Sequence, residues 1–140
     1  MRLVFADTGY WIALLNPRDT LHLKAIILSK RLQSTHIITS EMVLTEVLTA
    51  FAKFDPVLRL AAIRLIEELK SMTNVTIVPQ TSQQFQQALS LYAERLDKAW
   101  SLTDCSSFKI MAAYRITDAL AYDKHFAQAG FTPLLREHIS

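Results

Sequence analysis

Four acidic side chains lie at positions from which they could share a divalent metal ion: Asp7, Glu46, Asp104 and Asp123. Asp7 directly follows the apolar run 3–6, and Asp123 directly follows the apolar run 119–122. We expect both runs to be strands of one parallel sheet, and ligands bind at the edge where the carboxyl ends of such strands meet. The two aspartates are therefore predicted to lie close together, although each alone could equally cap a following helix or start a turn.

Glu46 lies within a predicted helix over residues 41–54 and has no cation one turn away. The residues three and four positions from it are Met42, Val43, Thr49 and Ala50. The ion pair that is usual on a helix surface is therefore missing. A carboxylate among apolar and small residues is costly unless it has a partner, and a metal ion would be one. A solvated glutamate on the helix flank is the alternative interpretation.

The turn that contains Asp104 is rich in hydroxyl side chains, namely Ser101, Thr103, Ser106 and Ser107. Thr103 is the predicted N-cap of a helix over residues 104–114, and a negative charge in its first turn suits the helix dipole. That role would account for Asp104 by itself. The surrounding hydroxyls, however, could also orient a carboxylate or a metal-bound water.

If all four carboxylates meet at one point, they require positive charge nearby. Two like charges ~4 Å apart repel by roughly 4 kcal/mol at an effective dielectric constant of about 20. One or two hard cations would remove this cost, and oxygen ligands favour Mg²⁺ or Mn²⁺. Zn²⁺ is disfavoured because the sequence holds one cysteine, Cys105, and no Cys/His cluster. Such a site can activate water and stabilise the charge on a phosphodiester, which is the chemistry of nucleic-acid hydrolysis.

These carboxylates must be positioned by alternating short strands and helices. We predict strands at 3–6, 36–39, 75–78 and 119–122, with an edge strand at 131–134. Helices are predicted from the end of the first strand through Leu14, over 21–33, 41–54, 56–72, 82–96 and 104–114, and in a short segment ending at Gly130. Short apolar strands separated by helices indicate an α/β fold with a parallel sheet covered on both faces.

The bulk composition is that of a folded chain. The 140 residues, of which 51% are apolar and 20% charged, predict one domain over 1–140. A net charge of +2 restricts any nucleic-acid binding to a local patch. The first apolar run is too short for a signal peptide, and no run approaches the ~18 residues of a membrane span. We therefore expect a cytoplasmic protein without a membrane segment.

Four segments resemble the motifs of PIN domains, and of their VapC-type members in particular. They are D-T-G-Y-W-I-A-L at 7–14, S-E-M-V-L-T-E-V at 40–47, D-K-A-W-S-L-T-D-C-S-S-F at 97–108, and I-T-D-A-L-A-Y-D-K-H-F at 116–126 followed by A-G-F. The segments occur in order and cover nearly the whole chain, and the last two together are the most specific.

The resemblance implies a three-layer α/β/α PIN fold with a parallel sheet of four to five short strands. It also implies a metal-dependent endoribonuclease with Mg²⁺ or Mn²⁺, the toxin of a VapBC-type pair with a cognate antitoxin, and a homodimer. The catalytic and metal-binding acids carry over as Asp7, Glu46, Asp104 and Asp123. Residues expected to support them are Thr8, Ser40 and Thr103.

Lys124 and His125 are the best candidates for contacts with RNA phosphates, because both directly follow Asp123. A solvated, mixed-charge surface is the alternative for either residue. Asp118 also lies near Asp123 but is expected at the start of the strand, roughly 16 Å away along an ideal strand, and we leave it out of the site. Cys105 has no identifiable base partner, so we expect a buried structural thiol.

Two other functions compete with a VapC-type nuclease. The first is a stand-alone or catalytically silent PIN-fold module that binds RNA or protein, and the presence of all four acids argues against silence. The second is a phosphatase resembling the haloacid dehalogenases. Those enzymes need Asp-x-Asp after the first strand, whereas this sequence has Asp7-Thr8-Gly9.

Overall fold

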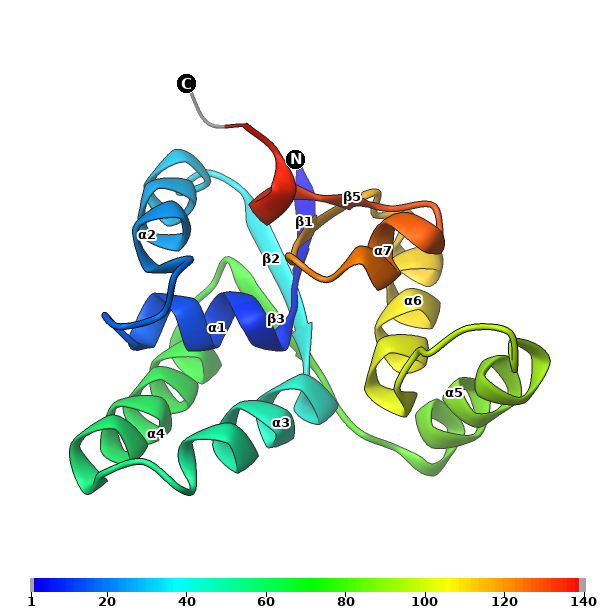
Figure 1. Cartoon of the computed structure of the whole chain (residues 1–140), viewed down its shortest axis with the longest axis horizontal. Helices are drawn as coiled ribbons and strands as arrows, with labels where there is room; N and C mark the ends of the chain where they lie inside the picture. Colours follow the sequence, from blue (N-terminus) through cyan, green and yellow to red (C-terminus); the bar gives the residue numbers. More distant parts are fainter. Residues whose placement is uncertain (1, 139–140) are drawn as a thin grey trace.

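The computed structural model describes residues 2–138. Its strands form one sheet in the order β3-β2-β1-β4-β5, and all neighbours run parallel (Figure 1). The strands are β1 (Leu3–Ala6), β2 (His36–Ser40), β3 (Val75–Val78), β4 (Asp118–Leu120) and β5 (Thr132–Pro133). The predicted parallel α/β fold is confirmed, and the edge strand that carries Pro133 is the fifth strand.

Helices flank the sheet. They are α1 (Thr8–Leu15), α2 (His22–Arg31), α3 (Glu41–Phe51), α4 (Pro56–Ser71), α5 (Ser82–Glu94), α6 (Leu102–Tyr114) and α7 (Lys124–Gln128), followed by a 3-10 turn, Leu134–Arg136. Figure 1 shows α1, α3 and α4 to one side of the central strands, and α5 and α6 to the other. None of the helices between residues 2 and 138 combines the length and the apolar character that a membrane crossing needs.

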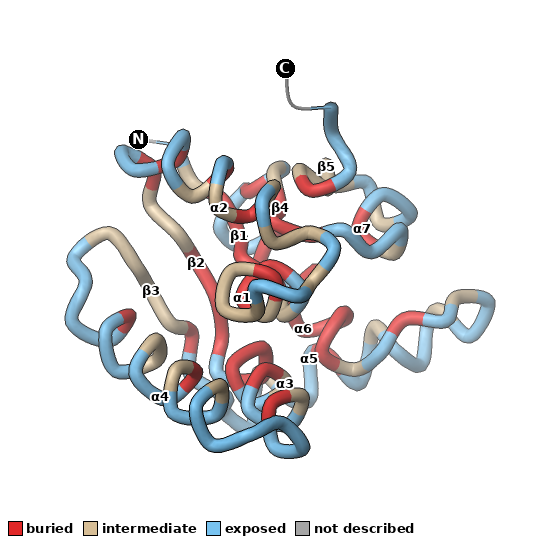
Figure 2. The backbone as a smooth tube through the Cα atoms, turned by 60° about the vertical axis from the view of Figure 1, so that its left-hand side comes forward, coloured by how far each residue is buried: buried red, intermediate tan, exposed pale blue. Residues whose placement is uncertain are grey.

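The core lies around the central strand β1. Val4, Phe5 and Ala6 are fully buried, because β1 pairs with β2 on one side and β4 on the other and is covered by helices (Figure 2). A strand buried on both faces has no polar face, which explains the continuous apolar run.

Three predicted boundaries are wrong at the places that matter for the site. The fourth strand is Asp118–Leu120 and not 119–122, so Asp123 lies three residues beyond its end. The ladder ends there because the carbonyl of Ala121 accepts a hydrogen bond from Leu135, in the 3-10 turn, at 3.1 Å. The helix expected from 104 begins at Leu102, and the helix expected to reach 54 ends at Phe51.

The strand order locates a crevice. The chain moves from β1 outward to β2 and β3, and then returns to place β4 on the opposite side of β1. The order therefore reverses between β1 and β4. In open α/β sheets, ligands bind beyond the carboxyl ends of the strands at this reversal point, where Asp7 directly follows β1 and Asp123 follows β4 after two intervening residues.

Candidate active site

Asp7 leaves the carboxyl end of β1 and is only 8% exposed. Its backbone N–H donates to the carbonyl of Leu120 at 3.1 Å, which ties the ends of β1 and β4 together. Asp7 occupies the N-cap position of α1, but its side chain makes no capping hydrogen bond. Capping of the helix by the side chain therefore does not explain this carboxylate.

A buried polar pair that the sequence did not reveal holds the end of β1. The Thr39 hydroxyl donates to the carbonyl of Ala6 at 2.9 Å and accepts from Trp11 Nε1 at 3.2 Å. Both side chains are buried, so these hydrogen bonds satisfy polar groups that would otherwise be costly. They fix the backbone directly before Asp7.

Asp104 is held by the first turn of α6. The Ser101 hydroxyl accepts from the backbone N–H of Asp104, and the Asp104 carboxylate accepts from the backbone N–H of Ser101, each at 3.0 Å. This reciprocal pair is a capping box. The expectation that Thr103 caps the helix is wrong, and Ser101 does so instead. Thr103 is buried and does not line the cavity described below.

His125 joins two of the acids. Its Nδ1 lies 2.9 Å from Asp104 Oδ2 and 3.1 Å from Asp123 Oδ1. Its backbone N–H also donates to Asp123 Oδ1 at 3.0 Å, so Asp123 caps α7. The sequence placed His125 among the RNA-binding candidates, whereas the structure packs its ring against the acids. Lys124, the other candidate, is exposed and lies outside the cavity lining.

Glu46 approaches from α3 and accepts a hydrogen bond from the Thr8 hydroxyl at 2.7 Å. Thr8, in the first turn of α1, therefore joins the helix after β1 to the helix after β2. Ser40 caps a helix and does not line the cavity that Glu46 reaches. Its hydroxyl accepts from the backbone N–H of Val43 at 3.1 Å, at the start of α3.

All four predicted acids line one cavity of about 360 Å³. The other residues around it are Thr8, Gly9, Ile12, Ala99, Ser101, Tyr122 and His125. Asp118 lies elsewhere and pairs with Arg2 at 2.8 Å, as its place at the start of β4 predicts. The chain thus brings together carboxylates that are up to 116 positions apart in the sequence.

The acids influence one another. The pKa of Asp7 is raised from 3.8 to about 7, chiefly by burial and to a smaller extent by the charges of Asp104, Glu46 and Asp123, although the backbone N–H of Thr8 lowers it. A buried carboxyl beside like charges favours its protonated form, and a cation reverses that preference. Burial and the charge of Asp104 also raise the pKa of the Cys105 thiol, which favours its protonated form.

The donor set suits a hard cation. Ligand atoms of Asp104, Asp123 and His125 all lie within 4.8 Å of one another, and Asp7 and Glu46 line the same cavity. Carboxylate oxygens dominate this set, which favours Mg²⁺ or Mn²⁺.

This fold and site define a family. Residues 4–132 match the PIN domain, and the chain belongs to the PIN-domain family. Among the similar proteins is the 23S rRNA-specific endonuclease VapC20, found in two strains of Mycobacterium tuberculosis (CDC 1551 / Oshkosh and ATCC 25618 / H37Rv). Each is 30% identical over 141 residues, which cover 96% of this chain and 100% of the relative.

A solved structure agrees with the match in sequence. The crystal structure of Mycobacterium tuberculosis VapC20, described as a sarcin–ricin loop cleaving toxin, superposes on this fold with a TM-score of 0.78 at 29% identity. The match covers 93% of this chain and 97% of that chain. The resemblance to VapC-type PIN domains seen in the sequence motifs is thereby confirmed.

Proposed function

We propose that this protein is a metal-dependent endoribonuclease that hydrolyses RNA phosphodiesters, with Asp7, Glu46, Asp104 and Asp123 as its metal-binding and catalytic acids. The observation that carries the proposal is the convergence of these carboxylates in one cavity at the carboxyl edge of the sheet. The homology to VapC20 supports RNA as the substrate.

The residues around the acids support this chemistry. A bound Mg²⁺ or Mn²⁺ would polarise a phosphoryl oxygen and lower the pKa of an attacking water. Thr8 orients Glu46 by a hydrogen bond, and the Ser101 backbone N–H and His125 orient Asp104. Groups held in this way need little rearrangement during the reaction, which is the main protein contribution to such catalysis.

The VapC20 relatives also suggest the biological setting. We propose that the protein is the toxin of a VapBC-type pair, blocked by a cognate antitoxin, and that it forms a homodimer. The name of the relative points to structured ribosomal RNA as the substrate class. An enzyme that cleaves ribosomal RNA acts where ribosomes are, so we propose activity in the cytoplasm.

A cleavage assay tests the proposal. A synthetic 23S rRNA sarcin–ricin stem-loop and total RNA are incubated with purified protein and Mg²⁺ or Mn²⁺, with and without EDTA. We expect cleavage that EDTA abolishes and that Asp7→Asn and Glu46→Gln each reduce by about a hundredfold or more, because one removed ligand weakens the whole site.

Glu41→Gln is the matched control for Glu46→Gln. Glu41 lies on the same helix but accepts a hydrogen bond from the backbone of Gln80 at 2.7 Å, outside the cavity. Its variant is expected to cleave like the wild type. Unchanged cleavage in Asp7→Asn would contradict the assignment of the site. Tight RNA binding without cleavage, at any divalent ion concentration, would instead indicate a silent RNA-binding module.

A further inference from the structure

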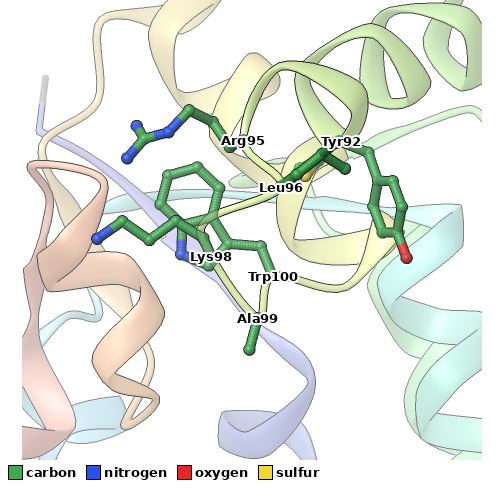
Figure 3. Close-up of a pocket in the computed structure, with 7 residues that line it drawn as sticks. Tyr92, Arg95, Leu96, Lys98, Ala99 and Trp100 are labelled. Atoms are coloured by element: carbon green, nitrogen blue, oxygen red, sulfur yellow. The ribbon is translucent and has the colours of Figure 1, made fainter.

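A second cavity lies directly beside the acid cavity. It has a volume of about 180 Å³ and is lined by Tyr92, Arg95, Leu96, Lys98, Ala99, Trp100 and Cys105 (Figure 3). Ala99 lines both cavities, and the neighbouring residues of the chain alternate between them. Trp100 and Cys105 face the second cavity, whereas Ser101 and Asp104 face the acids. Ala99 and its neighbours in the chain therefore separate the two cavities.

Two cations belong to this second cavity, Arg95 and Lys98, and they differ in their partners. Arg95 makes two hydrogen bonds to Asp97, each of 3.0 Å, and its guanidinium lies over the Trp100 ring at 5.0 Å from the ring centre. Arg95 thus holds Trp100 in place. Lys98 makes no ion pair with any residue between 2 and 138, although it lies close enough to Asp97 to help lower the pKa of that carboxyl.

Two large side chains of the lining are exposed. Tyr92 is 46% exposed and Leu96 is 82% exposed, so both side chains are open to a ligand. Figure 3 shows Arg95 and Lys98 extending together toward one end of the cavity, with Tyr92 toward the other. Trp100 is only 6% exposed and its Nε1 donates to Gln128 at 3.0 Å, so Tyr92 is the aromatic face that remains available.

We propose that this cavity is an RNA subsite that takes a nucleotide next to the bond that is cut, with Lys98 on its phosphate and Tyr92 stacked on its base. The inference rests on the proposed ribonuclease function. A free ammonium group attracts phosphate, and exposed aromatic rings stack on bases of any sequence. The shared wall at Ala99 places this nucleotide beside the acid cavity. With a net charge of only +2 for the whole chain, RNA binding depends on local contacts of this kind.

RNA binding is measured in an Asp7→Asn background, so that cleavage does not interfere. The probe is a fluorescein-labelled 23S rRNA sarcin–ricin stem-loop, followed by anisotropy at several salt concentrations. We expect Lys98→Gln to raise the Kd about fivefold and to reduce the slope of log Kd against log salt by about one. Lys53→Gln removes the same charge from the turn after α3 and is expected to change neither quantity.

Two substitutions of Tyr92 distinguish base stacking by its ring from a hydrogen bond through its hydroxyl. We expect Tyr92→Ala to weaken binding about fivefold or more and Tyr92→Phe to bind like the parent, because the ring and not the hydroxyl makes the contact. In the cleaving enzyme, Lys98→Gln and Tyr92→Ala should raise KM and leave kcat within about twofold. Thermal melts of each variant check that the substitutions leave the fold intact.

Two results would contradict the proposed RNA subsite. One is equal binding by the Lys98→Gln and Lys53→Gln proteins, and the other is a loss in Tyr92→Phe as large as in Tyr92→Ala. Failure of the ribonuclease proposal looks different, because the wild-type protein would then leave RNA intact in Mg²⁺ and Mn²⁺ while the binding assay still reports on Lys98 and Tyr92.

Discussion

At the scale of single residues, the chemistry depends on how each acid is held. Asp7 is buried without a capping role, and its pKa is raised to about 7. Asp104 and Asp123 share the Nδ1 of His125, and Glu46 is tied to Thr8. The site is thus made of carboxylates whose positions are set by neighbouring groups and whose mutual repulsion favours a bound cation.

The pKa of Asp7 has a consequence for stability without metal. Its folded value of about 7 lies above its ordinary value of 3.8, so the folded protein binds more protons than the unfolded chain between these values. In EDTA, the contribution of Asp7 to the free energy of unfolding should therefore fall as pH rises from about 4 to about 7, and then level off. Urea unfolding of wild type and Asp7→Asn across this range measures the difference, and parallel curves would contradict the raised pKa.

His125 should be needed for activity as a positioning residue. His125→Gln removes the ring nitrogen that lies between Asp104 and Asp123. Removing such a partner of a metal-binding carboxylate typically costs ten- to a hundredfold in metal affinity or activity. We expect a loss of that size in Mn²⁺ affinity as well as in kcat. A change in KM alone would show that His125 contacts RNA instead.

At the scale of elements, helix ends do the positioning. Asp7 directly precedes α1, Asp104 lies in the first turn of α6, and Asp123 directly precedes α7 and caps it. The capping box of α6 links helix stability to the orientation of Asp104, because the same carboxylate closes the box and faces the cavity. Any change that frays this turn should therefore disturb the site.

The Ser101→Ala variant tests this link. Loss of an N-cap hydroxyl costs about 1 kcal/mol of stability, and here it should also lower the cleavage rate because Asp104 loses its fixed position. Thr81→Ala is the matched control, since Thr81 caps α5 by the same kind of bond, 3.1 Å to the N–H of Gln84, away from the acids. Both variants should lose similar stability, measured by urea unfolding. Equal cleavage by the two would contradict the link.

The sequence predicted the strands and the convergence of the four acids at one edge of the sheet, but it did not predict the contacts between distant segments. Apolar runs at β1 and β3 are local patterns, and their bounds were correct to the residue. The Ser101-x-x-Asp104 capping box is present in the sequence, but our prediction placed the cap at Thr103. Nothing local indicated that Thr39 would bond the carbonyl of Ala6, or that the His125 ring would reach Asp104. Those contacts arise only when the sheet assembles.

At the scale of the whole molecule, the described helices and strands pack on one continuous hydrophobic cluster, and the strand order creates the crevice between β1 and β4. We propose that residues 1–140 unfold as one cooperative unit. Calorimetry should give one transition whose van't Hoff and calorimetric enthalpies agree. Two separable transitions would contradict a single folding unit, and a Tm that rises with protein concentration would support the proposed homodimer.

We propose that the four carboxylates together bind the divalent ion on which RNA cleavage depends. Calorimetric titration of the metal-free protein with Mn²⁺ at pH 8, where Asp7 is ionised, tests it most directly. We predict saturable binding by the wild type and by Glu41→Gln, weakened at least about tenfold in each of Asp7→Asn, Glu46→Gln, Asp104→Asn and Asp123→Asn. Absence of Mn²⁺ binding by the wild type, or equal affinity in all of these proteins, would contradict it.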